Sequence, residues 1–483
     1  MKKNKLIFGI ISLALLILAI FCPPILGMSA EGARCLIVFI VFLILSLTNI
    51  LPSGMASILC TCFMGVIGGF TGMGAAFKSV SVSLMAFCMG TLAITVALKR
   101  TSIPHRVAAF AAKISGGNSK VIILFFMFAA CLLSAIMSNV AACATLASMA
   151  YGICKTQEET ANGVKNFGKC MMVGIPVAAG IGGCGTIAGS VNNVTALEML
   201  TSYNGSTIDF GPWAILMIPA TLVAMVLVWL ILITIWKPEK LGEEVVASTH
   251  QKSADKMTAI DKKSAFVITL MVVLWISTTW VKIYNTNFIS LLGVALFILS
   301  GCFSWDEFSK EIRWDSVLLC GGVMGVVQGL INTGVDAWLG DVLFGHVTSL
   351  SPIILGMLIT LAGFILHAFI PVGGPIASIL TLPAISLCEK VGLNPAIAVM
   401  LVLVGANTCT LLPIDHLPIL TQTYGYYKPA DYTKAGIPVT IALTILLGVT
   451  PLGYLPPIFG VEITIMCLPV IIATIALGLR GGL

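Results

Sequence analysis

The stretch from Leu133 to Ala142 constrains this chain most, because a polar tip separates two apolar runs that are each too short to cross a bilayer. The runs cover 121–137 and 140–152, whereas a spanning helix needs about 20 apolar residues. Together they predict a re-entrant hairpin that enters the membrane and turns back at Ser138-Asn139. A polar tip at that depth is tolerated only where it lines a cavity or is buried in protein, so we expect it to form one wall of a solute site.

The composition is that of a membrane protein. The chain is 58% hydrophobic and only 10% charged, whereas soluble proteins carry about 25% charged residues. We therefore expect an all-α polytopic membrane protein with about a dozen crossings. The net charge of +6 does not indicate nucleic-acid binding, because most basic residues fit in short loops. The fifteen cysteines are scattered singly through apolar segments, which is typical of packing residues.

The apolar runs follow the same order twice along the chain. After an N-terminal helix (1–32), the first repeat (33–236) contains an amphipathic segment at 102–118, the hairpin at 121–152, a broken helix at 170–201 and a span at 211–236. A polar cytoplasmic linker (237–263) leads to the second repeat (264–457), with an amphipathic segment at 334–347, a hairpin at 350–389 and a broken helix at 394–424. A C-terminal helix is expected at 458–483.

The basic residues predict the orientation. With the N-terminus in the cytoplasm, all but four of the 26 Lys and Arg residues fall inside; the four outside are Arg34, Lys78, Lys282 and Lys390. This asymmetry agrees with the positive-inside rule. It makes the first hairpin face the cytoplasm and the second face outward, so the halves are inverted repeats. Both termini are then cytoplasmic, and we expect a multi-pass protein of the inner (plasma) membrane.

The hairpin tips and helix breaks have the groups that an ion and an anion require. In inverted-repeat transporters the site lies where half-helices end inside the membrane, and their N-termini attract anions. The hydroxyls of Ser134 and Ser138, the Asn139 amide oxygen and the carbonyls of Gly183 to Gly185 are oxygens that suit a sodium ion. The alternative is that these small residues only allow close helix packing. Their clustering at both breaks favours a site.

Three motifs resemble one family. Ser138-Asn139-Val140 resembles the Ser-Asn-Thr hairpin signature of the divalent anion:sodium symporters, a group that includes sulfate, dicarboxylate and citrate carriers. The stretch from Gly182 to Asn193 is similar to that family's G-G-x-G-T-x-x-G-T-P-P-N motif. The stretch from Leu412 to Pro418, with the tyrosines and glycines that follow it, is similar to the corresponding motif of the second half.

The resemblance implies particular roles for these residues. It implies a sodium site at Ser134, Ser138, Asn139, Gly183 and Gly185, and substrate contacts at Asn139, Val140 and Ser190. It also implies a homodimer and an elevator-like movement of the domain that carries the hairpins.

The chain departs from the family pattern in its second half. Val140 replaces the signature threonine and removes one hydroxyl. In the second hairpin, Gly373-Gly374-Pro375 stands where Ser-Asn-Thr is expected, so the substrate contacts assigned to Gly374 and Pro375 use the backbone. The second sodium site therefore lacks its usual side chains.

Asp415 and His416 stand where the family has a small residue and a threonine. An ionisable residue at membrane depth is costly and is a functional hypothesis by default. Asp415 is a candidate cation or proton site, and His416 a candidate contact for an anionic substrate. The alternative is an Asp–His pair that only ties the broken helix together. We expect His367 to be a packing residue.

These observations predict a secondary transporter of small di- or tricarboxylates, coupled to sodium, to protons or to exchange. The alternative is another carrier with the same architecture, for sulfate, for arsenite or for sodium/proton antiport. An integral-membrane enzyme is a remote alternative, because the spans contain no HExxH motif and no paired acidic cluster. The expected partners are a small anion, the lipid bilayer and a second copy of the chain, and not nucleic acid.

Overall fold

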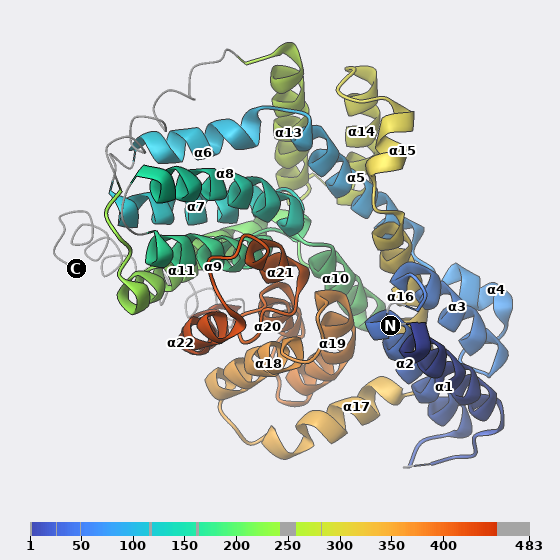
Figure 1. Ribbon diagram of the computed structural model, residues 1–483. Coiled ribbons are helices and arrows are strands. Elements are labelled where there is room, and N and C mark those ends of the chain that lie inside the picture. Colours follow the sequence, from blue (N-terminus) through green and yellow to red (C-terminus); the bar gives the residue numbers. More distant parts are fainter. Residues whose placement is uncertain are drawn as a thin grey trace.

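The computed structural model describes residues 2–25, 27–48, 50–114, 118–160, 164–241, 257–281 and 283–451 (Figure 1). Every regular element in these ranges is a helix, which confirms the all-α fold class. Five segments are long and apolar enough to span a bilayer: α2 (Ala30–Thr48), Met73–Lys99, α11 (Phe210–Trp236), α16 (Trp314–Asn332) and α22 (Pro429–Leu447). The predicted C-terminal helix at 458–483 and most of the linker at 237–263 lie outside the described residues.

The first half has a pair of packed helices where the re-entrant hairpin is predicted and an interrupted helix where the broken helix is predicted. Its other elements are α1 (Lys2–Phe21), α3 (Ser53–Val66), α4 (Met73–Lys78), α5 (Val82–Lys99) and α6 (Ile103–Ile114). The first hairpin is α7 (Ser119–Ser134) followed by α8 (Asn139–Thr160). The helix expected at 170–201 is interrupted between α9 (Lys165–Gly183) and α10 (Val191–Asn204), with the short 3-10 helix η1 (Ile187–Gly189) in the gap. We call residues 184–190 the first break.

The second half has the same order of elements. It begins with α13 (Ala259–Ser277), α14 (Thr286–Leu299) and α15 (Trp305–Glu311), and α16 is followed by α17 (Val335–Phe344) and η2 (Gly345–Val347). The second hairpin is α18 (Pro352–His367) and α19 (Gly373–Lys390). The second broken helix is α20 (Ala396–Asn407) and α21 (His416–Gln422), and residues 408–415 are the second break. The short helices α4 and α15, which the sequence did not predict, occupy equivalent places before α5 and α16.

The packing repeats as well as the order. Helix α3 packs on α16 while α14 packs on α5, and α8 packs on α21 while α19 packs on α10. Helices α3, α5, α8 and α10 of the first half correspond to α14, α16, α19 and α21 of the second. The contacts between the halves therefore form two equivalent pairs. Figure 1 shows α1 to α5 and α14 to α16 on one side and the hairpins on the other, with α10 between them in contact with α16 and α19.

Glycines allow the hairpins to lie against the broken helices. A methyl group added at Gly182 of α9 would overlap the Cys131 carbonyl of α7. A methyl group added at Gly373 of α19 would overlap the Ala406 carbonyl of α20. Backbones this close exclude any side chain, so both hairpins are held directly against the ends of α9 and α20.

The cysteines are packing residues in the part of the chain that the structure describes. Fourteen are free, and all of these are buried except Cys62, which is half-buried. Small polarizable side chains of this kind fill gaps between apolar helices.

Candidate functional site

A cavity of about 360 Å³ lies where the two hairpin tips meet the two breaks. The first half contributes Ser138, Asn139 and Val140 of one tip and the segment 188–192, which leads into α10. The second half contributes the tip 372–374, the end of α20 and the start of α21. The opposite wall comes from α3, α5 and the start of α16. Ligand pockets have volumes of about 300–1,000 Å³, so this cavity suits a small metabolite.

Three oxygen atoms converge behind the first tip. Oγ of Ser134, at the end of α7, lies 2.6 Å from Oδ1 of Asn139 and 2.6 Å from the carbonyl oxygen of Ala179. Both neighbours are acceptors here, and a hydroxyl has only one hydrogen to donate. One of the two short oxygen–oxygen contacts therefore has no proton between its atoms, and a bound cation would stabilise that arrangement.

The glycine loop of the first break lies against the same group. A Cβ atom at Gly183 would be 2.5 Å from the Asn139 side chain, so only glycine leaves room for the amide. The carbonyl oxygens of Gly183 and Ser134 lie within 2.6 and 3.0 Å of the position that a Cβ of Gly189 would occupy. Oxygen atoms of Ser134, Asn139 and Gly183 therefore lie close together. Such a set of neutral oxygens fits a hard cation such as sodium.

Two other residues assigned to the cation site lie apart from this group. The side chain of Ser138 lines the cavity, and its backbone N–H donates to Thr95 Oγ1 at 3.0 Å. Gly185 lies beside Gly182 and Thr221.

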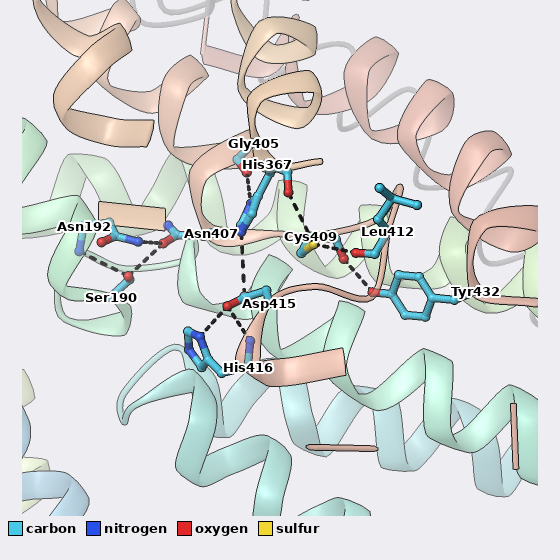
Figure 2. A network of polar contacts seen from close by, with 10 residues as sticks. All are labelled: Ser190, Asn192, His367, Gly405, Asn407, Cys409, Leu412, Asp415, His416 and Tyr432. Atoms are coloured by element: carbon cyan, nitrogen blue, oxygen red, sulfur yellow. Dashed lines mark hydrogen bonds and ion pairs between the residues drawn. The ribbon is translucent and has the colours of Figure 1, made fainter. Parts of the chain in front are cut away.

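The first break is joined to the second by side-chain amides. Asn407, the last residue of α20, accepts hydrogen bonds at Oδ1 from Ser190 Oγ (2.7 Å) and Asn192 Nδ2 (3.0 Å). Its Nδ2 donates to Asn193 Oδ1 at 2.7 Å, and Asn193 Nδ2 donates to the Gly183 carbonyl at 2.7 Å. Figure 2 shows Ser190 and Asn192 facing Asn407 across the two chain segments. This connection runs from Gly183, a candidate cation-site residue, to the second half.

The second break has an acid between two histidines (Figure 2). Asp415 is the N-cap of α21: its Oδ1 accepts from the His416 backbone N–H at 2.6 Å and contacts His416 Nδ1. Its Oδ2 lies 3.8 Å from Nε2 of His367, whose Nδ1 makes a 2.7 Å hydrogen bond with the Gly405 carbonyl. Asp415 and His367 are buried, whereas the His416 side chain is half-exposed and lines the cavity. His367 thus joins the second hairpin to the second broken helix.

The two half-helices at the breaks begin differently. Ser190 caps α10, and its Oγ accepts from the Asn192 backbone N–H at 3.2 Å. Asp415 occupies the same place before α21. A carboxylate neutralises the partial positive charge of a helix N-terminus, whereas a hydroxyl leaves it available to an anion. The N-terminus of α10 is therefore the more suitable of the two for an anionic group.

The remaining predicted contacts lie at the second tip. Gly374 lines the cavity, and its carbonyl accepts a 3.0 Å hydrogen bond from Ser378 Oγ. Pro375 is buried in α19 and is not among the lining residues.

Several residues around the cavity were not predicted from the sequence. Asn407 was not predicted because an amide has no distinctive local pattern, and Asn193, which ends the motif at 182–193, was given no role of its own. Arg313 and Asp315 line the opposite wall, where the sequence predicted only a cytoplasmic loop and the start of a span. The sequence does contain one indication of this wall, because the opposite charges of Arg313 and Asp315 stand directly before an apolar run.

Comparisons with known proteins agree with this architecture. A family model for the sodium:sulfate symporter transmembrane region matches residues 3–460. The chain is 23% identical over 405 residues to a sodium-dependent dicarboxylate transporter SdcS of Staphylococcus saprophyticus, covering 78% of this chain and 77% of that protein. It is also 23% identical over 403 residues to SdcS of Staphylococcus aureus, with the same coverage.

A solved structure has the same fold. The crystal structure of the Alcanivorax borkumensis YdaH transporter aligns with a TM-score of 0.54 and 15% sequence identity, covering 92% of this chain and 97% of that one. At this identity the likeness concerns the fold alone. The family model, by contrast, matches nearly the whole sequence, and on that ground the chain belongs to the sodium:sulfate symporter family.

Proposed function

We propose that this protein is a secondary transporter that couples the movement of a small di- or tricarboxylate to sodium. The cavity carries the proposal, because both hairpin tips, both breaks and the N-terminus of α10 surround one volume of about 360 Å³. The printed names of the staphylococcal relatives, sodium-dependent dicarboxylate transporters, support it. Carriage of sulfate or arsenite, or sodium/proton antiport, is the alternative. Enzymatic activity is not part of the proposal.

The sodium ion is cargo that binds behind the first tip. The oxygens of Ser134, Asn139 and Gly183 are its ligands, whereas Ser138 and Gly185 lie apart from them. The substrate binds on the cavity side, where Asn139, Val140 and Ser190 meet its first anionic group. From the second half, the Gly374 backbone and the His416 side chain face the substrate, whereas the buried Pro375 does not line the cavity.

The two halves are inverted repeats in the plasma membrane. The first hairpin faces the cytoplasm and the second faces outward, with both termini in the cytoplasm. Close backbone contacts at Gly182 and Gly373 support a hairpin-bearing domain that moves as one piece, in an elevator-like manner within a homodimer.

The test is succinate uptake by purified protein in liposomes with an inward sodium gradient. Asn139→Ala should reduce uptake at least about tenfold, because it removes a ligand of the cation and a polar group of the cavity. Asn204→Ala, which removes an exposed amide at the end of α10, is the control and should transport normally. The proposal would be contradicted if succinate uptake by the wild type did not depend on the sodium gradient, or if Asn139→Ala were fully active. Parallel uptake of sulfate and of arsenite tests the alternatives.

Asp415 supports a second form of coupling, by protons or by exchange. Asn also caps helices well, so Asp415→Asn keeps the α21 cap and removes only the charge that faces two histidines. We expect a changed dependence of uptake on sodium and pH. Asp341→Asn, at an exposed ion pair with Lys390, is the control. Identical profiles for Asp415→Asn and wild type would leave Asp415 only as a helix cap.

A further inference from the structure

Arg313 is a cation on the wall of the cavity. It precedes α16, its side chain is exposed, and it lines the cavity opposite the hairpin tips. The other charged residues that line the cavity are Asp315 and Asp415, with His416 beside them. Arg313 is thus the one arginine or lysine among the described residues that line it.

Local folding gives no reason for an arginine at this position. Arg313 is the N-cap of α16 and makes no side-chain capping hydrogen bond. The equivalent residue before α5 is Ser81, whose Oγ accepts from the Leu84 backbone N–H at 3.2 Å. Serine suits an N-cap, whereas a positive side chain there opposes the helix dipole. A residue that breaks a local rule in this way is expected at a functional position.

Neighbouring acids do not neutralise Arg313. Asp315 Oδ1 accepts a 2.7 Å hydrogen bond from the Gly54 backbone N–H and so caps the start of α3. Asp415 contacts His416 and faces His367. Within the described ranges, the Arg313 guanidinium makes no hydrogen bond or ion pair. Its positive charge is therefore available to a molecule in the cavity.

We propose that Arg313 binds one carboxylate of the substrate and so makes the cavity selective for doubly charged anions over singly charged ones. This inference rests on the proposed function. A guanidinium binds a carboxylate through two parallel hydrogen bonds. The other carboxylate lies at the first tip and the N-terminus of α10. A monoanion occupies only one of these two places, so it gains little from Arg313.

The substrate then contacts two groups of helices at once. Arg313 precedes α16, which packs on α3 and α5, whereas Ser138 to Val140 belong to the first hairpin. A dianion of the right length bridges the two groups, and a shorter or singly charged anion does not.

The experiment compares succinate with its monomethyl ester in liposomes that contain wild-type protein, Arg313→Gln, Arg313→Lys or Lys310→Gln. We expect Arg313→Gln to raise the KM for succinate about tenfold or more while leaving the KM for the monoester nearly unchanged. Arg313→Lys keeps the charge without the paired donors and should lie between wild type and Arg313→Gln. Lys310→Gln removes an exposed charge from α15, outside the cavity lining, and should resemble wild type.

The ratio of the two KM values separates recognition from folding, since a misfolded variant loses both substrates equally. Equal KM ratios in wild type and Arg313→Gln would overturn the inference, as would equal effects of Arg313→Gln and Lys310→Gln. If wild-type protein carries neither succinate nor its ester and binds neither in a thermal-shift assay, the proposed function fails instead.

Discussion

Ser190 Oγ donates a 2.7 Å hydrogen bond to Oδ1 of Asn407, a residue 217 positions further along the chain. The bond joins the N-cap of α10, in the first break, to the end of α20, where the second break begins. Asn407 also forms hydrogen bonds with Asn192, which lines the cavity with it, and with the buried Asn193. The two breaks therefore form one polar unit.

Asn407→Ala should destabilise this unit. The buried Asn193 Oδ1 would lose its donor, and leaving one buried polar atom without a partner costs about 1–3 kcal/mol. Thermal unfolding in detergent should show the loss, and succinate uptake should fall with it. The exposed Asn204 provides the matched control. If Asn407→Ala unfolds like wild type, the amide connection contributes nothing to stability.

Two neighbouring glycines should respond differently to the same substitution. In Gly373→Ala the new methyl group meets the Ala406 carbonyl, and overpacking of this kind costs about 1–3 kcal/mol. In Gly374→Ala the nearest atoms, on Asn192 and Leu319, are 3.6 Å away, which is an ordinary contact. Apparent melting temperatures of the two variants are the measurement. Equal temperatures would show that the second tip can move away from α20.

Ser134→Ala should weaken sodium coupling more than substrate binding. The substitution removes one of three converging oxygens and leaves the cavity wall unchanged. We expect the sodium concentration for half-maximal succinate uptake to rise about tenfold, consistent with loss of one strong ligand. Ser148→Ala on the exposed side of α8 is the comparison. If the sodium concentration for half-maximal uptake is unchanged in Ser134→Ala, Ser134 is not a ligand of the ion.

Asp261 lies in the first turn of α13, ahead of the apolar part of that helix. Its carboxylate makes the free energy of unfolding depend on pH. Its carboxylate accepts from the Ser102 backbone N–H and hydroxyl, both at 2.8 Å, and from the Thr258 N–H at 2.8 Å. Burial alone would raise the pKa of Asp261, but these hydrogen bonds lower it from 3.8 to about 2. Because the folded pKa lies below the unfolded one, the stabilisation is present above pH 3.8 and is lost as the pH falls towards 2.

Asp261→Asn should therefore be less stable than wild type at neutral pH, by about 1–3 kcal/mol. The difference should shrink as the pH falls through that window, because wild type loses the same interaction by protonation. Thermal unfolding of both proteins in detergent across acidic pH is the test, with Asp306→Asn on the exposed side of α15 as control. A difference that stays constant with pH would assign the effect to shape and not to charge.

Local features of the sequence predicted the helical elements well. Ser138-Asn139 interrupts an apolar run, and the structure places the turn directly before Asn139. Glycines at 182, 183 and 185 predicted the first break, because glycine and unpaired polar groups end a helix where an apolar run would continue it. The short helices α4 and α15 were not predicted, since six or seven residues do not establish a hydrophobic period.

The composition of the cavity wall could be predicted only in part. Asn139, Val140, Ser190, Gly374, Asp415 and His416 lie in motifs, and all of them line the cavity. Arg313 and Asn407 owe their places to contacts between residues far apart in the chain, which no local pattern encodes. Pro375 illustrates the converse: it follows a lining residue, but the helical turn at the start of α19 directs it into the core.

The burial of the cysteines makes topology measurable by chemical labelling. Among the described thiols only Cys62 is not buried, so the other thirteen should react slowly with membrane-impermeant maleimides. The fifteenth cysteine, Cys467, lies outside the described residues. With Cys62 and Cys467 replaced, a single cysteine introduced at position 310 or 390 would report its own accessibility from each side of a vesicle. A cysteine at position 78, at the end of α4, provides the comparison from the first half, because α4 and α15 occupy equivalent places before α5 and α16. Opposite sidedness of positions 78 and 310 is the direct signature of the inverted arrangement.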